Sequence, residues 1–129
     1  MQRVRDLIKP ANLDKNGVFK YIQILIEPFD SPEPGNEYVV VRGWADCAYH
    51  ADILNKFRYS ELGTNDLEDD FRAECPGGGR IEVNEEAKTI LVYGYSQGFG
   101  RANHALTKEI LENSVQYNDY AISWSNEGY

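Results

Sequence analysis

The sequence predicts an α/β (α+β) fold, a single small domain in which two main helices pack on a mixed β-sheet of about six strands. Three observations predict it. The length of 129 residues suits one compact domain. The hydrophobic share of 42%, with 12% aromatic residues, is enough for a core. Segments with the period of strands flank two segments with the period of helices. No repeat or linker divides residues 1–129, so we expect one domain.

The first elements follow from turn residues and from alternation. Residues 1–13 are expected to form a loose N-terminal arm that ends at the turn "DKNG". "VFKYIQILIEP" (18–28) alternates as a long strand, with its isoleucines on one face and Lys20 at the start of that face. "FDSPEPGNE" (29–37) contains two prolines and a glycine and is expected to be a loop. "YVVVRGW" (38–44) is expected to be a short, largely buried strand.

Two segments have helical periodicity. In "YHADILNKFRYSELG" (49–63), His50 lies on the same stripe as the apolar residues, and Gly63 is a plausible stop. "RANHALTKEILENS" (101–114) is the second predicted helix. Its inward-facing residues are expected to be Ala102, Ala105, Leu106 and Ile110.

The remaining segments complete the sheet. "TNDLEDDFRAEC" (64–75) is acidic and ambiguous, a loop entering a strand. "PGGG" (76–79) is expected to be a tight turn. "RIEVNEEAKTILVYGY" (80–95) has the pattern of a hairpin, and "YAISWSNEGY" (120–129) closes the chain as a strand.

The charge pattern limits the partners. A net charge of -8 argues against nucleic acid and anionic membranes, because both attract basic surfaces. An anion site would need a local group of basic residues. Lys20, Arg42, Arg80 and Arg101 each lie at a strand end or a glycine turn, positions that can converge on one rim of a sheet. The alternative is four solvated surface charges.

Two cysteines, Cys47 and Cys75, lack metal-ligand spacing, and no clustered ligand set is present, so we expect no metal and no cofactor. Free thiols fit a reducing compartment, and a disulfide is the alternative. The N-terminus lacks the apolar core of a signal peptide, and no apolar run reaches membrane-spanning length. We expect a cytoplasmic protein and, since no amphipathic stretch is left for a partner, a monomer.

The stretch "VYGYSQGFGRANHA" (92–105) contains G-x-S-x-G, the pattern of a serine hydrolase nucleophile elbow. The order of a triad is wrong, because the only histidine after Ser96 is His104, and the candidate acid Asp119 follows it. We favour a phosphate-binding loop before a helix that begins near Arg101, with donors from the backbone, the Ser96 hydroxyl and the helix N-terminus. A purely structural turn is the alternative.

The two histidines differ in position. His104 falls off the apolar stripe of its helix and is expected to be solvated or capping. His50 lies on the apolar stripe at a helix start, where burial and the positive helix end both lower a histidine pKa. A neutral imidazole there can act as base or nucleophile. A core-edge histidine without a catalytic role is the alternative.

Several motifs occur together in unbroken order: "NGVFKY", "VVRGW", "YHADI", "CPGGGRI", "VYGYS" and the ending "YAISWSNEGY". Over roughly Asp14 to Tyr129 the chain resembles the 14 kDa phosphohistidine phosphatase family, also called the janus family. The resemblance implies a small α/β domain without a metal. It also implies removal of phosphate from phosphohistidine and, in some members, from phospholysine. In insects the family is tied to sex differentiation.

The resemblance assigns roles to individual residues. It implies that His50 of "YHADI" is catalytic and that Lys20 of "VFKY" binds substrate. It implies that the phosphoryl group is held by Ser96, Gln97 and Gly98. Two departures lie in this loop: Arg101 stands where the family pattern has proline, and Gly98 stands where alanine is frequent.

The chemistry follows from these roles. Breaking a P–N bond requires charge stabilisation on the phosphoryl oxygens and an in-line attacker. Lys20 and the loop can supply the first, with Arg42 and Arg80 as candidate helpers by position. His50 either attacks phosphorus or activates a water as general base. The expected partners are phosphohistidine-containing proteins. The rival class is a non-catalytic module that binds them in the same pocket and does not need His50.

Overall fold

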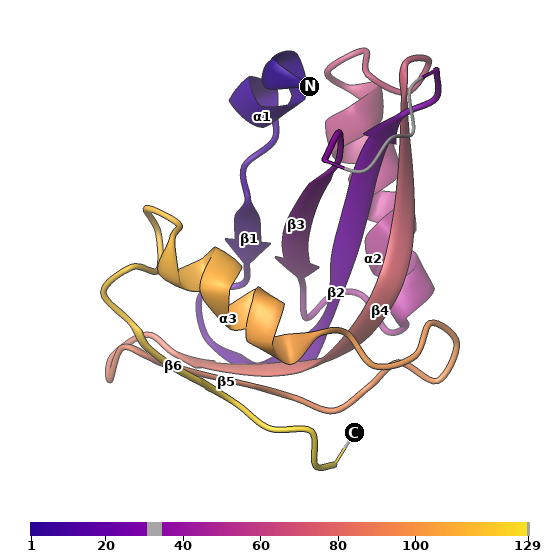
Figure 1. Ribbon diagram of the computed structural model, residues 1–129. Coiled ribbons are helices and arrows are strands. Elements are labelled where there is room, and N and C mark those ends of the chain that lie inside the picture. The colour runs from indigo at the N-terminus through magenta and orange to yellow at the C-terminus, as the bar shows by residue number, and fades with distance from the viewer. Residues whose placement is uncertain (31–34, 129) are drawn as a thin grey trace.

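The computed structural model describes residues 1–30 and 35–128 and has the predicted α+β class (Figure 1). One six-stranded mixed sheet with the order β1-β3-β2-β4-β5-β6 curls into a half-barrel. The strands are β1 (Ala11–Leu13), β2 (Gly17–Pro28), β3 (Tyr38–Gly43), β4 (Phe71–Asn84), β5 (Thr89–Tyr93) and β6 (Ala121–Trp124). The helices are α1 (Gln2–Leu7), α2 (His50–Phe57), its π-helical continuation η1 (Arg58–Gly63) and α3 (His104–Glu112).

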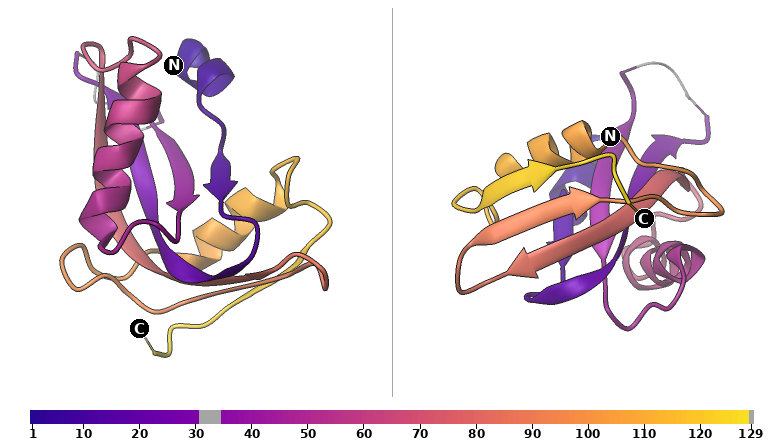
Figure 2. Two further views of the ribbon diagram at one scale, coloured as in Figure 1. Left: turned by 180° about the vertical axis from the view of Figure 1, so that it is seen from behind. Right: turned by 90° about the horizontal axis from the view of Figure 1, so that it is seen from below.

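The two faces of the sheet carry two separate cores. The outer face buries the alternating Ile22, Ile24 and Ile26 of β2 beneath α2, as the strand pattern predicts. The hollow face holds α3, which packs on residues that alternate with them, among them Phe19 and Tyr21. Figure 2 shows α2 and α3 on opposite sides of the curled sheet. The strand β2 therefore supplies side chains to both cores.

The expectation of a loose arm over residues 1–13 is wrong. Residues 2–7 form α1, and β1 pairs in parallel with β3. Val4 and Ile8 are buried in the outer core, and the Tyr38 hydroxyl donates to the Ile8 carbonyl at 2.8 Å. Burial of apolar side chains and backbone pairing with a distant strand hold this segment in place.

The expectation of a tight turn at residues 76–79 is also wrong. The three glycines lie inside β4, opposite β2, just after an irregularity in the register between Gln23 and Leu25 of β2. The glycines are needed for space. A Cβ on Gly78 would lie 2.7 Å from Cδ2 of His50, and a Cβ on Gly79 would lie 2.8 Å from Cε1 of His104. The run of glycines admits a histidine ring to each face of the sheet.

The second helix differs from its predicted form. It begins at His104, because the Asn103 side chain caps it by accepting from the Leu106 N–H at 3.1 Å. The residues of α3 that are buried are His104, Thr107 and Leu111, whereas Ala105 is exposed and Leu106 and Ile110 are only partly buried. The expectation that His104 is solvated or capping is therefore wrong, because its side chain is buried and Asn103 supplies the cap.

The other predicted elements are confirmed, including the long first strand, the second strand, the helix from His50, the hairpin and the final strand. The predicted loop 29–37 lies in part outside the described residues, as does Tyr129 at the end of the last predicted strand.

Candidate functional site

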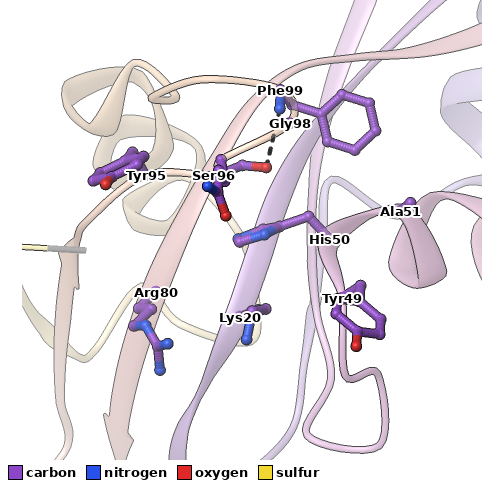
Figure 3. Close-up of a pocket in the computed structure, with 10 residues that line it drawn as sticks. Lys20, Tyr49, His50, Ala51, Arg80, Tyr95, Ser96, Gly98 and Phe99 are labelled. Carbon is purple, nitrogen blue, oxygen red and sulfur yellow. Dashed lines mark hydrogen bonds between the residues drawn. The ribbon is translucent and has the colours of Figure 1, made fainter.

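A pocket opens where the start of α2, the paired strands β2 and β4 and the loop 94–100 meet (Figure 3). Its lining includes most of the residues singled out from the sequence. The lining residues are Lys20, Tyr49, His50, Ala51, Arg80, Tyr95, Ser96, Gln97, Gly98 and Phe99. The pocket thus joins three segments that are far apart in the chain.

His50 is the first residue of α2, and its side chain is only 9% exposed. Its Nε2 atom lies 2.9 Å from the carbonyl oxygen of Gly79. A carbonyl oxygen only accepts hydrogen bonds, so Nε2 carries the proton and the neutral ring keeps its lone pair on Nδ1. The imidazole extends from α2 toward Ser96 (Figure 3). The backbone of β4 therefore fixes both the orientation and the tautomer of this ring.

The electrostatic surroundings keep His50 neutral. Burial lowers the pKa of the imidazole below its ordinary value, and the positive charges of Lys20 and Arg80 lower it further. The bond to Gly79 opposes this shift. A neutral imidazole at pH 7 retains the lone pair that a base or a nucleophile requires.

Lys20 and Arg80 form a pair of like charges. They are direct register partners on the adjacent strands β2 and β4, and both line the pocket. Like charges directly opposite each other on a sheet repel and destabilise it. Within the described residues, no acidic side chain forms an ion pair with Lys20. The arrangement is suited to an anion that would neutralise both side chains.

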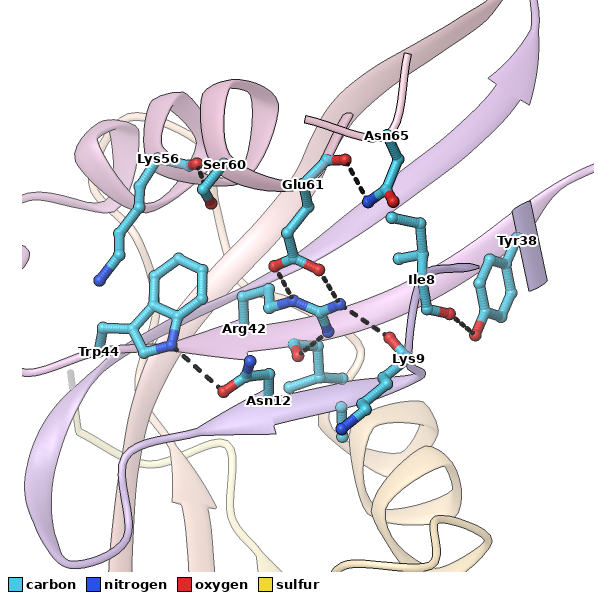
Figure 4. A network of polar contacts seen from close by, with 12 residues as sticks. Ile8, Lys9, Asn12, Tyr38, Arg42, Trp44, Lys56, Ser60, Glu61 and Asn65 are labelled. Carbon is cyan, nitrogen blue, oxygen red and sulfur yellow. Dashed lines mark hydrogen bonds and ion pairs between the residues drawn. The ribbon is translucent and has the colours of Figure 1, made fainter. Parts of the chain in front are cut away.

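The structure does not bring Arg42 into this group. Its guanidinium is fully buried and binds Glu61 of η1 through two bonds of 2.8 Å, Nε to Oε2 and Nη2 to Oε1 (Figure 4). It also donates to the carbonyl oxygens of Lys9 and Val41. Arg42 therefore links β3, η1 and the N-terminal segment, and the prediction that it helps to hold phosphate is corrected to a structural role.

Arg101 is exposed and is not a lining residue of the pocket. Its backbone forms an isolated bridge with Gly78 of β4. Of the four basic residues expected to converge, the structure brings together Lys20 and Arg80.

The loop from Gly94 to Gly100 is closed by its own backbone. Ser96 and Gly100 exchange two hydrogen bonds, and the Phe99 N–H donates to Ser96 Oγ at 3.1 Å. Ser96 is buried, and its hydroxyl proton stays available because Oγ acts as acceptor in that bond. In the part of the chain that the structure describes, the N–H groups of Gln97 and Gly98 have no hydrogen-bond partner. The loop can offer several donors to an anion in the pocket.

The helix N-terminus at the pocket belongs to α2, whereas the sequence pointed to the second helix. Tyr49, His50 and Ala51 line the pocket, and no residue of α3 does. Asp52 caps this end by accepting from the Tyr49 N–H at 3.0 Å. Any favourable helix dipole at the pocket therefore comes from the helix that carries His50.

Four lining residues were not singled out from the sequence: Tyr49, Ala51, Tyr95 and Phe99. Each adjoins a predicted residue in "AYHADI" or in the glycine loop, and that adjacency is the signal that could have found them.

Across residues 1–30 and 35–128, no three His, Cys, Asp or Glu side chains are grouped so that they could hold a metal ion. No helix in the same ranges combines the length and the apolar character needed to cross a membrane.

Fold and pocket together define a small α+β protein whose basic pocket is built around a neutral histidine. The profile of the Janus/Ocnus family matches residues 6–121, and the chain belongs to this family. It is 48% identical over 121 residues to the sex-regulated protein janus-A of Drosophila melanogaster, covering 92% of this chain and 80% of the relative. It is 37% identical over 124 residues to the 14 kDa phosphohistidine phosphatase of Sus scrofa, covering 95% of this chain and 93% of the relative. The family resemblance seen in the motifs is confirmed.

Proposed function

We propose that this protein is a metal-independent protein phosphohistidine phosphatase that hydrolyses the P–N bond of phosphohistidine, with phospholysine as a second candidate substrate. One observation carries the proposal: a neutral His50, with Nδ1 unprotonated, shares a pocket with the paired cations Lys20 and Arg80. A relative with 37% identity is named a 14 kDa phosphohistidine phosphatase, which supports the same class of substrate.

The phosphoryl group would bind between the two cations and the loop. Lys20 and Arg80 neutralise its charge, while the Ser96 hydroxyl and the N–H groups of Gln97 and Gly98 donate to its oxygens. These groups all line the pocket beside His50. Charge that develops on the equatorial oxygens in the transition state is stabilised by donors that are already in place.

Two routes then use Nδ1 of His50. In the first, Nδ1 attacks phosphorus, the P–N bond of the substrate breaks, and the leaving imidazole takes up a proton. Water then hydrolyses the phosphohistidine formed on the enzyme. In the second, Nδ1 removes a proton from a water as that water attacks phosphorus, the P–N bond of the substrate breaks, and the protonated His50 gives its proton to the leaving imidazole. Both routes end with inorganic phosphate and a neutral His50.

The test separates an enzyme from a binding module. Wild type and His50→Ala are each mixed with a chemically phosphorylated histidine peptide, and both binding and phosphate release are followed. We expect His50→Ala to bind the peptide and leave it intact, while the wild type releases phosphate. Binding by both without release by either would favour a non-catalytic module. We further propose that the protein acts as a cytoplasmic monomer on phosphohistidine-containing proteins.

A further inference from the structure

A second buried histidine lies on the hollow face of the sheet, away from the pocket. His104 is 1% exposed, and it connects two partners that are distant in the chain. Its Nδ1 lies 2.6 Å from the hydroxyl of Tyr21 on β2, and its Nε2 lies 2.7 Å from the carbonyl oxygen of Gly94. Gly94 is the first residue of the loop that lines the pocket.

The hydrogen bonds of this group run in one direction. The Gly94 carbonyl can only accept, so Nε2 of His104 donates and Nδ1 accepts from the Tyr21 hydroxyl. The Tyr21 oxygen then accepts from the Thr107 hydroxyl at 3.0 Å, and Thr107 accepts from the Gln23 side-chain amide at 2.8 Å. Every polar group has a partner, so the ring of His104 has one favoured tautomer and one orientation.

The ring of His104 also contacts the strand that holds His50. A Cβ on Gly79 would lie 2.8 Å from Cε1 of His104, so the bare backbone of Gly79 packs directly against this ring. The carbonyl oxygen of the same Gly79 accepts the hydrogen bond from His50 Nε2. One imidazole thus touches both the start of the loop and the backbone that orients His50.

Gly94 is a position where small movements matter. Its φ of 74° lies in the left-handed region, where the chain turns from β5 into the loop. The residues from Tyr95 to Phe99 that line the pocket follow directly. A rotation at Gly94 would therefore displace the donors of the loop relative to Lys20 and Arg80.

We propose that His104, oriented by Tyr21, is a positioning residue that fixes the phosphoryl-binding loop through Gly94 and supports His50 through Gly79. It does not line the pocket and acts through the backbone. The effect that we expect on catalysis rests on the proposed function. The effect that we expect on anion binding follows from the geometry alone.

The test uses three variants with graded chemistry. His104→Phe keeps a ring and removes both nitrogens. His104→Gln restores an amide N–H that can reach the Gly94 carbonyl. Tyr21→Phe removes only the hydroxyl that orients the ring. Inorganic phosphate is the probe, and its affinity is measured by NMR titration of the loop amides, alongside kcat and KM for a phosphohistidine peptide and thermal unfolding.

We expect His104→Phe to weaken phosphate binding and to lower kcat/KM by about 10- to 100-fold, because small misplacements of binding groups have effects of this size. His104→Gln should recover part of the loss, and Tyr21→Phe should show a smaller loss of the same kind. Glu61→Ala is the matched control, since it lowers stability at a site away from the loop and should leave phosphate affinity unchanged.

Unchanged phosphate affinity in folded His104→Phe would overturn the proposal, as would a His104→Gln variant no better than His104→Phe. If His104→Phe does not fold, unchanged affinity in Tyr21→Phe has the same consequence. A wild type that binds phosphate and releases none from the peptide would refute the proposed activity alone. A wild type that does not bind phosphate would overturn both.

Discussion

The Nε2 atom of His50 and the carbonyl oxygen of Gly79 are 2.9 Å apart, so the imidazole in the pocket is held by the backbone of β4. The contact requires the glycine run, because a side chain on Gly78 would collide with the ring. The same bond leaves Nδ1 as the atom with a lone pair. The reactivity proposed for His50 therefore depends on the backbone of β4, which contributes the Gly79 carbonyl oxygen and no reactive side chain at this contact.

The first prediction concerns pH. Only neutral His50 can act, and burial together with Lys20 and Arg80 holds its pKa below the ordinary value of 6.5. We expect kcat/KM to be constant near pH 7 and to fall on acidification with a midpoint below pH 6.5. Lys20→Met removes one positive charge, so the midpoint should move to higher pH. Lys108→Met, on the distant α3, should leave the midpoint unchanged. A midpoint that is the same in Lys20→Met and in the wild type would argue against this electrostatic account.

The second prediction concerns Ser96. Its Oγ accepts from the Phe99 N–H, and its side chain is one of several donors that we propose bind phosphate. Ser96→Ala should lower kcat/KM by ~100- to 1,000-fold without abolishing activity, the size of effect seen when one preorganised donor is removed. Serine-reactive phosphonates should leave the wild type unlabelled. Complete loss together with covalent labelling would restore the serine hydrolase interpretation.

The third prediction compares two glycines of the loop. A Cβ on Gly98 would meet no atom within 4 Å, so Gly98→Ala should keep phosphate affinity and melting temperature. Gly100 has a φ of 88°, and Gly100→Ala should destabilise the loop by about 1–2 kcal/mol and weaken phosphate binding. Titration with inorganic phosphate checks both. Equal effects of the two substitutions on phosphate affinity would argue that the backbone conformation of the loop does not determine phosphate binding.

The fourth prediction concerns the buried ion pair. Arg42 is fully buried and Glu61 supplies its carboxylate, so removing Glu61 leaves an uncompensated charge in the core. Glu61→Ala should lower the free energy of unfolding by about 3 kcal/mol in urea denaturation. KM for the peptide, measured well below the melting temperature, should change little. A large rise in KM with unchanged stability would return Arg42 to the phosphate site.

The sequence carries local signals for most of the fold and for the center of the site. The alternation of β2 and the stripe of α2 each depend on neighbours in the chain, so the strands and the position of His50 could be predicted. The loop 94–100 could be predicted for the same reason, because its glycines and serine are contiguous.

The failures involve partners far away in the chain. The glycines 77–79 look like a turn, yet they lie in a strand where Gly78 makes room for the ring of His50 and Gly79 for the ring of His104. His104 lies off the apolar stripe expected from the sequence, yet it is buried, because it bonds to Tyr21, which is 83 positions away in the chain. Arg42 lies near a strand end, and only the folded chain shows that its guanidinium is paired with Glu61 and not available to the pocket. β1 is three residues long and depends on pairing with β3, which no local pattern reveals.

The most direct measurement is phosphate release from a chemically phosphorylated histidine peptide by wild type and by His50→Ala, with EDTA present. ³¹P NMR follows the loss of the P–N signal and the growth of inorganic phosphate in the same sample. The account predicts rapid conversion by the wild type and only the spontaneous rate with His50→Ala, unaffected by EDTA. Three results would contradict the account. They are conversion by His50→Ala at the wild-type rate, no conversion by the wild type, and loss of wild-type activity in EDTA.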